Sequence, residues 1–276
     1  MDIRGGCAIV TGGSSGIGKA IAKRLAARGA NTFLIARRED LLKSALEEVK
    51  KQAVNPSQKF GYFKADVGTL SQVQEAVRAA EAECGPPLVL ANSAGVSNAG
   101  YVEKTPISHI EDEIRVNYLG TVYMIKSVID GMMQRRRGWI LNVASLAGVK
   151  GIFGYAGYGA SKFAIIGFSE AIKAELRPYG IVVSVLCPPD TDTPMLVDDI
   201  KMKPVETRRI SEGASIMQPE DVARAAISGL EKGKLIIIPN FAGKLLWVAN
   251  RFVPSLVTRI LDSTVDKVRK ERGADR

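Results

Sequence analysis

Histidine and cysteine are scarce in this chain of 276 residues, which has one histidine and three cysteines. The cysteines lie far apart, no C-x-x-C spacing occurs, and an odd number leaves at least one unpaired. This usage predicts buried free thiols, no metal site, and a reducing compartment such as the cytoplasm. The single histidine, His109, lies among polar residues, so we expect it on the surface rather than in a catalytic site.

Long hydrophobic segments are also absent. No uncharged apolar stretch of about 18 residues occurs, so no membrane-spanning helix is expected. The first residues, Met-Asp-Ile-Arg-Gly-Gly-Cys, lack the basic and apolar regions of a secretory signal. Aromatic residues make up only 6% of the chain, whereas glycine is frequent. Such a composition suits helices packed on a sheet better than a β-sandwich.

Acidic residues are fewer than basic ones, and the formal net charge at pH 7 is +9. Nucleic acid is the obvious partner of a basic protein, but no aromatic-basic interleaving or nucleic-acid motif accompanies the charge. We therefore expect no nucleic-acid partner. An anionic cofactor or an anionic membrane surface would account for the charge equally well.

Apolar runs alternate with amphipathic segments along the whole chain. The apolar runs predict strands at 7–10, 31–36, 59–65, 88–91, 139–143, 181–186 and 235–238. Helical periodicity predicts helices at 19–28, 39–52, 70–84, 107–136 and 219–232, and a further helix that carries Tyr158 and Lys162 and ends near residue 177. No repeat or linker interrupts this alternation. It predicts one doubly wound, Rossmann-type α/β domain over 1–276, with a seven-stranded parallel sheet and helices on both faces.

The first strand runs into a glycine-rich turn, Thr11-Gly-Gly-Ser-Ser-Gly-Ile-Gly18, which opens a helix. Glycine permits positive φ and lets the backbone approach a ligand, and a helix N-terminus attracts anions. Strand, glycine-rich turn and helix in this order predict a dinucleotide phosphate site. A purely structural turn is the alternative.

Two arginines, Arg37 and Arg38, follow the second strand directly. In NAD sites an acidic residue near this position binds the ribose 2′-hydroxyl, whereas arginine suits a 2′-phosphate. The sequence therefore favours NADP(H) over NAD. Ordinary surface arginines are the alternative.

Tyr158 and Lys162 are four residues apart in a helical segment, so their side chains share one face. A lysine this close stabilises phenolate and is predicted to lower the pKa of Tyr158 from its ordinary value near ~10. Such a tyrosine can donate or accept a proton at neutral pH. An exposed helical pair is the alternative. Tyr155 has Gly159 at the corresponding spacing, so we expect it to line a substrate pocket instead.

Other polar residues come at the ends of predicted strands, where ligands of open parallel sheets bind. Asn92-Ser-Ala-Gly95 follows the fourth strand and Ser145 follows the fifth. Asn117 lies inside a predicted helix, where its amide competes for backbone hydrogen bonds. Either a functional role or a solvent-facing position would explain it.

Together these motifs resemble the short-chain dehydrogenase/reductase family from end to end. Thr11, Gly12, Gly16 and Gly18 match its T-G-x-x-x-G-x-G turn, and Asn92-Ser-Ala-Gly95 matches N-N-A-G with Ser93 replacing the second asparagine. The resemblance implies a catalytic tetrad of Asn117, Ser145, Tyr158 and Lys162. It also implies cofactor contacts from Gly12, Ser14, Ser15, Gly16, Ile17, Gly18, Arg37, Arg38, Asp66, Val67, Asn92, Ala94, Gly95, Tyr158, Lys162, Pro188, Thr191 and Thr193.

The family resemblance also implies a role for each catalytic residue. Tyr158 would donate its proton to the alkoxide that forms as hydride is transferred, and Ser145 would hydrogen-bond the carbonyl oxygen. Lys162 would bind the nicotinamide ribose, and Asn117 would hold a water that relays protons to Lys162. Members of the family are commonly dimers or tetramers, which implies a homo-oligomer.

The loop after the sixth strand carries a closer resemblance. Pro188-Pro-Asp-Thr-Asp-Thr-Pro194 replaces the usual Pro-Gly, and with the segment 203–212 it looks like the 3-ketodihydrosphingosine (3-dehydrosphinganine) reductases. This implies NADPH-dependent reduction of a lipid-like ketone. A reductase of a steroid, retinal or β-ketoacyl ketone, or a catalytically silent dinucleotide-binding scaffold, are the alternatives.

Two later segments have distinct compositions. Residues 195–216 are polar and mixed, and we expect an irregular substrate lid. Residues 241–276 should be helical, and basic residues interrupt the apolar, tryptophan-containing part at 241–261. Such a helix can lie peripherally at a membrane surface, at the cytoplasmic face for this protein. Packing against the domain or a second subunit explains it equally well.

Overall fold

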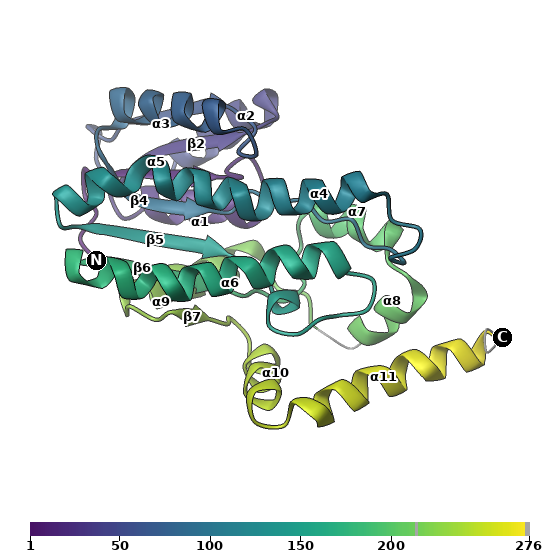
Figure 1. Ribbon diagram of the computed structural model, residues 1–276. Helices are drawn as coiled ribbons and strands as arrows, with labels where there is room; N and C mark the ends of the chain where they lie inside the picture. The colour runs from purple at the N-terminus through teal and green to yellow at the C-terminus, as the bar shows by residue number, and fades with distance from the viewer. Residues whose placement is uncertain (213–214, 274–276) are drawn as a thin grey trace.

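The computed structural model describes residues 1–212 and 215–273. Its centre is a seven-stranded parallel sheet in the order β3-β2-β1-β4-β5-β6-β7 (Figure 1). The strands are β1 (Cys7–Thr11), β2 (Asn31–Ala36), β3 (Phe60–Lys64), β4 (Pro87–Asn92), β5 (Gly138–Val143), β6 (Ile181–Leu186) and β7 (Ile236–Ile237). The predicted doubly wound fold is confirmed.

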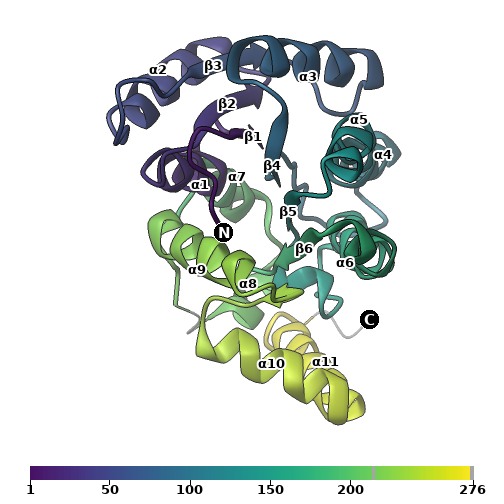
Figure 2. The same ribbon diagram turned by 90° about the vertical axis from the view of Figure 1, so that its left-hand side faces the viewer.

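Helices cover both faces of the sheet (Figure 2). One face packs against α1 (Gly16–Ala26), α2 (Glu39–Lys50) and α9 (Pro219–Glu231). The other packs against α3 (Leu70–Cys84), α5 (Gly120–Gln134) and α6 (Ala156–Leu176). Successive side chains of a strand point to opposite faces, so Val10 packs with the first group of helices and Ile9 with the second. This burial on both sides explains why the strands appear as continuous apolar runs.

The strand order reverses between β1 and β4, and the loops that follow these two strands are joined. The hydroxyl oxygen of Thr11 accepts hydrogen bonds from the backbone N–H groups of Ser93 (3.0 Å) and Ala94 (3.1 Å). In open α/β sheets the crevice at such a reversal is where ligands bind. Thr11 therefore holds the loops after β1 and β4 together at the predicted cofactor site.

The helical region predicted at 107–136 has an irregular middle. It consists of α4 (Ile107–Glu113), a π-helical turn η1 (Ile114–Leu119) and α5. π-helical turns often occur at functional sites. Asn117 lies inside this turn, so the residue that is a poor helix former stands where the helix departs from α geometry.

The expectation of an irregular segment at 195–216 is wrong for most of its length. It contains α7 (Pro194–Met202) and α8 (Val205–Ser211), while residues 213 and 214 lie outside the described residues. Thr193 caps α7 by accepting a hydrogen bond from the Leu196 N–H at 3.3 Å. The polar composition was misleading because several polar residues here face the protein interior: Asp199, Lys203, Glu206 and Thr207.

The chain ends in two further helices, α10 (Phe241–Phe252) and α11 (Pro254–Glu271), as predicted for this region up to the described limit at 273. α11 contacts α8, and Arg209 pairs with Glu271 at 2.7 Å. The two helices still expose large apolar side chains: Phe241, Leu245, Val248, Phe252, Val253, Leu256 and Ile260. None of the helices among the described residues combines the length and apolarity that crossing a bilayer requires.

Two smaller predictions also hold. All three cysteines, Cys7, Cys84 and Cys187, are buried and free. His109 is exposed on α4. The short helical turns η2 (Leu146–Gly148) and η3 (Arg177–Tyr179) follow β5 and α6 and complete the described elements.

Candidate active site

Three of the predicted catalytic residues meet beyond the carboxyl ends of β4 and β5. Ser145 follows β5 and caps η2, its hydroxyl oxygen accepting the Ala147 N–H at 3.1 Å. Tyr158 and Lys162 lie on the first turns of α6. The Lys162 ammonium is 5.5 Å from the centre of the Tyr158 ring, and the Ser145 side chain is close enough to the Tyr158 hydroxyl to lower the pKa of that phenol. A hydroxyl, a phenol and an ammonium thus share one small region.

The charge environment of Tyr158 differs from the sequence prediction. Burial of the phenol raises its pKa, and the nearby carboxylates of Asp199, Asp190 and Glu113 raise it further, whereas the hydrogen bond from Ser145 lowers it. The predicted lowering of the Tyr158 pKa by Lys162 is therefore wrong for the free protein. The reason is geometric: Lys162 donates its hydrogen bond to the Val143 carbonyl oxygen at 2.9 Å rather than to the phenol oxygen.

Lys162 is itself buried, with 4% of its surface exposed. Burial lowers the pKa of its ammonium from 10.5 to about 8. No carboxylate forms an ion pair with it among the described residues, and its only hydrogen bond there goes to Val143. A buried lysine held only by a carbonyl has donors left to bind a further group.

Asn117, the fourth predicted catalytic residue, is fully buried beside the same region. Its side-chain amide donates to the Val96 carbonyl oxygen and to the Ser161 hydroxyl, both at 2.9 Å, and its Oδ1 accepts the Val96 N–H at 2.8 Å. The side chain therefore holds the loop after β4 against α6. This burial excludes the solvent-facing alternative for Asn117, and its catalytic role stays a prediction. Its predicted water relay stays a prediction.

The glycine-rich turn has the close packing expected of a phosphate site. A Cβ on Gly18 would lie 2.4 Å from the Gly12 carbonyl oxygen, and Gly12 itself has φ +65°. Ser15 precedes the first turn of α1 without a side-chain hydrogen bond to it, so the first N–H groups of this helix are open to an anion. Ser14 and Ile17 belong to the same turn, Ser14 buried and Ile17 packed against the core. The turn fits a dinucleotide pyrophosphate.

The residues predicted for the adenosine half lie at the next two strand ends. Arg37 and Arg38 are exposed after β2. Asp66 and Val67 follow β3, where Asp66 pairs with Arg115 at 2.9 Å. The partly buried Asp66 carboxyl accepts the Gly68 N–H as well, and these contacts outweigh its desolvation to lower its pKa. Arg37 adds a positive charge nearby, so an anionic cofactor here would meet two exposed guanidinium groups.

The remaining predicted cofactor residues line the same edge of the sheet. Asn92 donates to Asn142 at 2.9 Å, while its own Oδ1 is buried without a donor among the described residues. Ala94 and Gly95 follow it, and a Cβ on Gly95 would lie 3.5 Å from the Lys162 ammonium. Thr193 lies against Gly16, while Pro188 and Thr191 are buried in the loop after β6. The predicted cofactor residues thus lie after the carboxyl ends of neighbouring parallel strands and on the first turns of α1 and α6, and their roles toward a cofactor stay predictions.

Sequence reasoning missed a second set of polar residues in this region, which consists of the buried Glu113, Ser161, Asp199 and Lys203 and the partly buried Ser97. Glu113 is 1% exposed and accepts the Asn98 N–H at 2.7 Å, and burial raises the pKa of its carboxyl to about 7. It stands at helical spacing from the buried Val116 and Gly120, which is a signal that could have revealed it. No comparable pattern marked Asp199 or Lys203, whose burial depends on tertiary packing.

Tyr155 was predicted to line a substrate pocket. It borders a cavity of about 530 Å³ between the start of α6 and α11. Apolar side chains dominate one part of the lining: Ile152, Phe153, Phe163, Ile210, Leu261 and Val265. The hydroxyl of Tyr155 donates to Asp199, so Tyr155 is not positioned as a second proton donor for a ketone oxygen bound by Ser145.

Comparison with known proteins identifies the family of this chain. The family model described as short chain dehydrogenase matches residues 6–204. The chain is 43% identical over 234 residues to a 3-dehydrosphinganine reductase of Danio rerio, covering 84% of this chain and 70% of that protein. The identity to a 3-ketodihydrosphingosine reductase of Mus musculus is also 43% over 234 residues, with the same 84% and 70% coverage.

Among solved structures, an actinorhodin polyketide ketoreductase crystallised with NADPH has a TM-score of 0.75 and 30% sequence identity. The match covers 84% of this chain and 95% of that one. Similar proteins thus combine this fold with ketone reduction, on lipid and on polyketide substrates alike.

Proposed function

This chain belongs to the short-chain dehydrogenase family of oxidoreductases, and we propose that it reduces 3-ketodihydrosphingosine to dihydrosphingosine with NADPH. The observation that carries the proposal is the meeting of Ser145, Tyr158 and Lys162 beside a glycine turn that fits a pyrophosphate. The 43% identity to reductases of this ketone supports the choice of substrate. The product is the secondary alcohol.

Each side chain has a defined task in this reduction. Bound NADPH supplies the hydride. The Tyr158 hydroxyl donates its proton to the oxygen of the former carbonyl, and Ser145 donates a hydrogen bond to the same oxygen as negative charge develops there. The Lys162 ammonium, buried next to Gly95, is placed to bind the nicotinamide ribose and to offset the charge left on Tyr158. Asn117 keeps the loop after β4 in place.

The preference for NADPH rests on Arg37 and Arg38. Both are exposed at the end of β2, where a 2′-phosphate would meet them. The solved ketoreductase with NADPH supports this choice by similarity.

A long hydrocarbon chain fits the surroundings of the site. The cavity beyond Tyr155 has a volume of about 530 Å³, which is typical of small-molecule sites, and its apolar side chains stand beside the charged Lys150, Asp262, Asp266 and Arg269. Helices α7 and α8, which follow the cofactor edge of β6, belong to the region for which we propose the role of a substrate lid.

The exposed apolar side chains of α10 and α11 support peripheral contact with a membrane surface, from which such a substrate would come. We call this set the C-terminal apolar surface; it consists of Phe241, Leu245, Phe252, Leu256 and Ile260, with Lys244, Arg251 and Arg259 nearby in sequence. Amphipathic helices of this kind bind anionic lipid through burial of apolar surface and through attraction between basic side chains and the lipid head groups. The family also favours a homo-oligomer, which light scattering would measure.

The test is a substrate panel. Purified protein is assayed with NADPH and with NADH against 3-ketodihydrosphingosine, a steroid ketone, retinal and a β-ketoacyl thioester. We expect the highest kcat/KM for 3-ketodihydrosphingosine with NADPH. A higher value for another ketone would reassign the substrate, and no turnover of any ketone would favour a silent dinucleotide-binding scaffold.

A further inference from the structure

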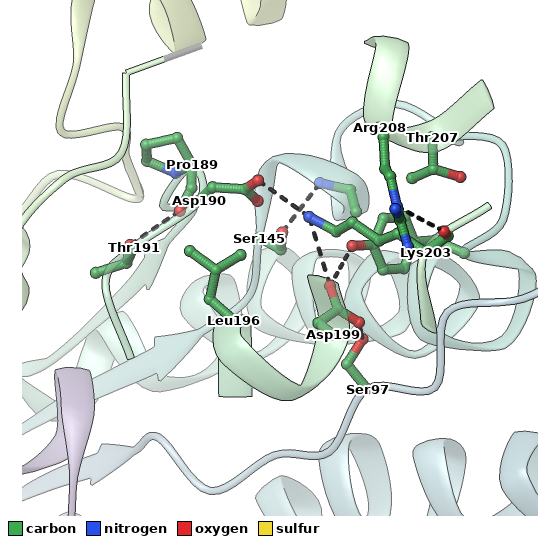
Figure 3. Close-up of polar contacts among 12 residues, drawn as sticks. Ser97, Ser145, Pro189, Asp190, Thr191, Leu196, Asp199, Lys203, Thr207 and Arg208 are labelled. Carbon is green, nitrogen blue, oxygen red and sulfur yellow. Dashed lines mark hydrogen bonds and ion pairs between the residues drawn. The ribbon is translucent and has the colours of Figure 1, made fainter. Parts of the chain in front are cut away.

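A buried ion cluster joins the lid to the catalytic helix (Figure 3). Lys203, at the end of α7, has only 3% of its side chain exposed. Its ammonium is 3.1 Å from the Asp190 carboxylate and 3.6 Å from that of Asp199. Asp190 belongs to the loop after β6, and Asp199 to α7. One buried lysine therefore bridges two carboxylates that lie on either side of the lid's first turn.

Asp199 is the centre of this cluster. One carboxylate oxygen accepts the hydroxyl of Tyr155 at the start of α6, and the other accepts the Ser97 hydroxyl at 3.0 Å. The lid is thereby attached to two segments that border the active site, the loop after β4 and α6. Asp199 is 6% exposed, so water competes little for these bonds.

Tyr155 carries the contact on to Tyr158. The two rings are 5.6 Å apart between centres and tilted by 50°, a distance typical of packed aromatic pairs. The Lys203 ammonium also lies 5.7 Å from the centre of the Tyr155 ring. Tyr155 is thus held between the lid ions and the Tyr158 ring.

The charges around Tyr158 do not cancel. The titratable groups around it are Lys162 on α6, Tyr155 before α6, Glu113 on α4, Asp190 after β6 and Asp199 on α7, while Lys203 faces the ring of Tyr155. Asp190 and Asp199 both disfavour phenolate at Tyr158, and Lys203 is the one cation bridging them among the described residues. With the lid in place, the cluster brings net negative charge toward Tyr158.

We propose that Asp199 and Lys203 are positioning residues of the lid that act on Tyr158 with opposite signs: Asp199, held on Tyr155, favours the proton-bearing form of Tyr158 by its charge, and Lys203 limits this effect. The inference rests on the proposed reductase function, because a reductase needs the phenol, not the phenolate, when it meets the ketone. The lid residues then contribute the net negative charge that favours the protonated form of Tyr158. A clamp that is only mechanical would have no effect on the ionisation of Tyr158.

The test compares charge variants of opposite sign. The oxidation of dihydrosphingosine by NADP⁺ is followed from pH 6 to pH 11, because Tyr158 must then accept a proton and the rate rises as it ionises. Asp199→Asn should displace the rising limb toward lower pH by roughly half a unit to one unit. Lys203→Met should displace it toward higher pH. A limb that stays in place, or moves in the same direction in both variants, would overturn the proposal.

A charge-balanced pair guards against loss of folding. Lys203→Met leaves the buried carboxylate of Asp199 and the partly exposed one of Asp190 without their cation, which can unfold the domain. Asp190→Asn removes a carboxylate that is 37% exposed, so it is milder, and should displace the limb toward lower pH. The double variant Asp190→Asn/Lys203→Met keeps the net charge and should return the limb to the wild-type position. Failure of the double variant to do so would contradict the electrostatic role.

A direct measurement separates this inference from the proposed function. The ¹³Cζ resonance of Tyr158, assigned by its loss in Tyr158→Phe, reports ionisation in the protein without substrate. Its titration should move with the same signs in the same variants, and circular dichroism verifies folding. Wild-type protein that turns over no ketone would refute the proposed function alone, whereas active protein whose Tyr158 titration ignores Asp199 and Lys203 would refute this inference alone. Tyr155→Phe keeps the charges and should leave the titration closest to wild type.

Discussion

The ammonium of Lys162 lies 5.5 Å from the centre of the Tyr158 ring, one helical turn away on α6, yet its hydrogen bond goes to the Val143 carbonyl oxygen at 2.9 Å. Val143 is the last residue of β5, and Ser145 follows it two residues later. The end of β5 therefore positions both Ser145 and the ammonium of Lys162. Because β5 and α6 are joined in this way, the hydroxyl of Ser145 and the phenol of Tyr158 keep a fixed relation. The proposed chemistry depends on this contact between β5 and α6.

Tyr158→Phe should abolish ketone reduction and leave NADPH binding intact. The substitution removes the proton donor and keeps the ring that packs against Tyr155. Loss of a general acid lowers the rate by about 10²- to 10⁴-fold. Steady-state kcat and a fluorescence titration of NADPH measure the two effects. Tyr155→Phe is the matched control, with a smaller loss expected, and equal losses in the two variants would argue against Tyr158 as the donor.

Lys162→Met should inactivate the protein and stabilise it at neutral pH. The ammonium has a pKa of about 8 in the folded chain and 10.5 as a model group, a difference worth about 3 kcal/mol. Below pH 8 the lysine is charged in both states, so its burial lowers the free energy of unfolding. As pH rises from 8 to 10.5 the folded lysine loses its proton first and this destabilisation disappears.

The gain for Lys162→Met should be about 2 kcal/mol near pH 7, since the Val143 carbonyl loses its donor at a cost of ~1 kcal/mol. The gain should shrink as pH rises from 8 to 10.5 and be mostly lost at pH 10. Urea unfolding at pH 7 and pH 10 measures both values, with Lys173→Met on the same helix as the control. If Lys162→Met is less stable than wild type at pH 7, burial of the Lys162 ammonium does not lower the free energy of unfolding, and the prediction is wrong.

Much of this architecture could be predicted from the sequence. Buried strands such as Ile181–Leu186 are continuous apolar runs. A glycine-rich turn between a strand and a helix, such as the one at Gly12, is typical of a dinucleotide phosphate site. The sequence also located Tyr158 and Lys162 on one helix face. Their spacing could not show that Lys162 would bond to Val143 on another element, and so the sign of the Tyr158 pKa change was predicted wrongly.

The lid was harder for the same physical reason. The helices α7 and α8 bury polar side chains, so their inward faces have no apolar periodicity to detect. Asp199 and Lys203 are an i, i+4 pair that would ordinarily be a solvent-exposed ion pair. Only the positions of Tyr155, Ser97 and Asp190 in space make this pair an interior cluster.

Gly18→Ala should prevent tight NADPH binding. The added Cβ would lie 2.4 Å from the Gly12 carbonyl oxygen, so the turn and the N-terminus of α1 must move apart. Overpacking of this kind costs about 1–3 kcal/mol, and the NADPH dissociation constant should rise at least about tenfold. Gly151→Ala is the matched control, because a Cβ there would meet nothing within 4 Å. An unchanged NADPH affinity in Gly18→Ala would contradict the placement of the pyrophosphate at this turn.

The double variant Arg37→Ala/Arg38→Ala should raise KM for NADPH by about tenfold or more and leave KM for NADH nearly unchanged. Each guanidinium that meets the 2′-phosphate contributes about 1.5–3 kcal/mol through charged hydrogen bonds. The exposed Arg78 on α3 provides the control, Arg78→Ala, which should alter neither constant. Equal effects on NADPH and NADH would point to a general charge effect rather than to recognition of the 2′-phosphate.

Phe241→Ser/Phe252→Ser should weaken binding to lipid vesicles while leaving the chemistry intact. These side chains on α10 are 80% and 78% exposed, so their loss removes apolar area without opening the core. Burying one phenylalanine side chain contributes about 1.5–3 kcal/mol, and the partition coefficient onto vesicles of phosphatidylcholine with phosphatidylserine should fall at least about tenfold. Turnover of a short, water-soluble ketone should be unchanged.

Ile107→Ser on α4 is the control for that experiment, because it removes an equally exposed apolar side chain, 69% exposed, outside the C-terminal apolar surface. Salt should weaken wild-type binding, because Lys244, Arg251 and Arg259 attract anionic lipid. Light scattering on the same samples decides between the two occupants of this surface. If Phe241→Ser/Phe252→Ser dissociates an oligomer and vesicle binding is absent from the start, α10 packs against a second subunit, and the substrate must reach the lid from solution rather than from the membrane.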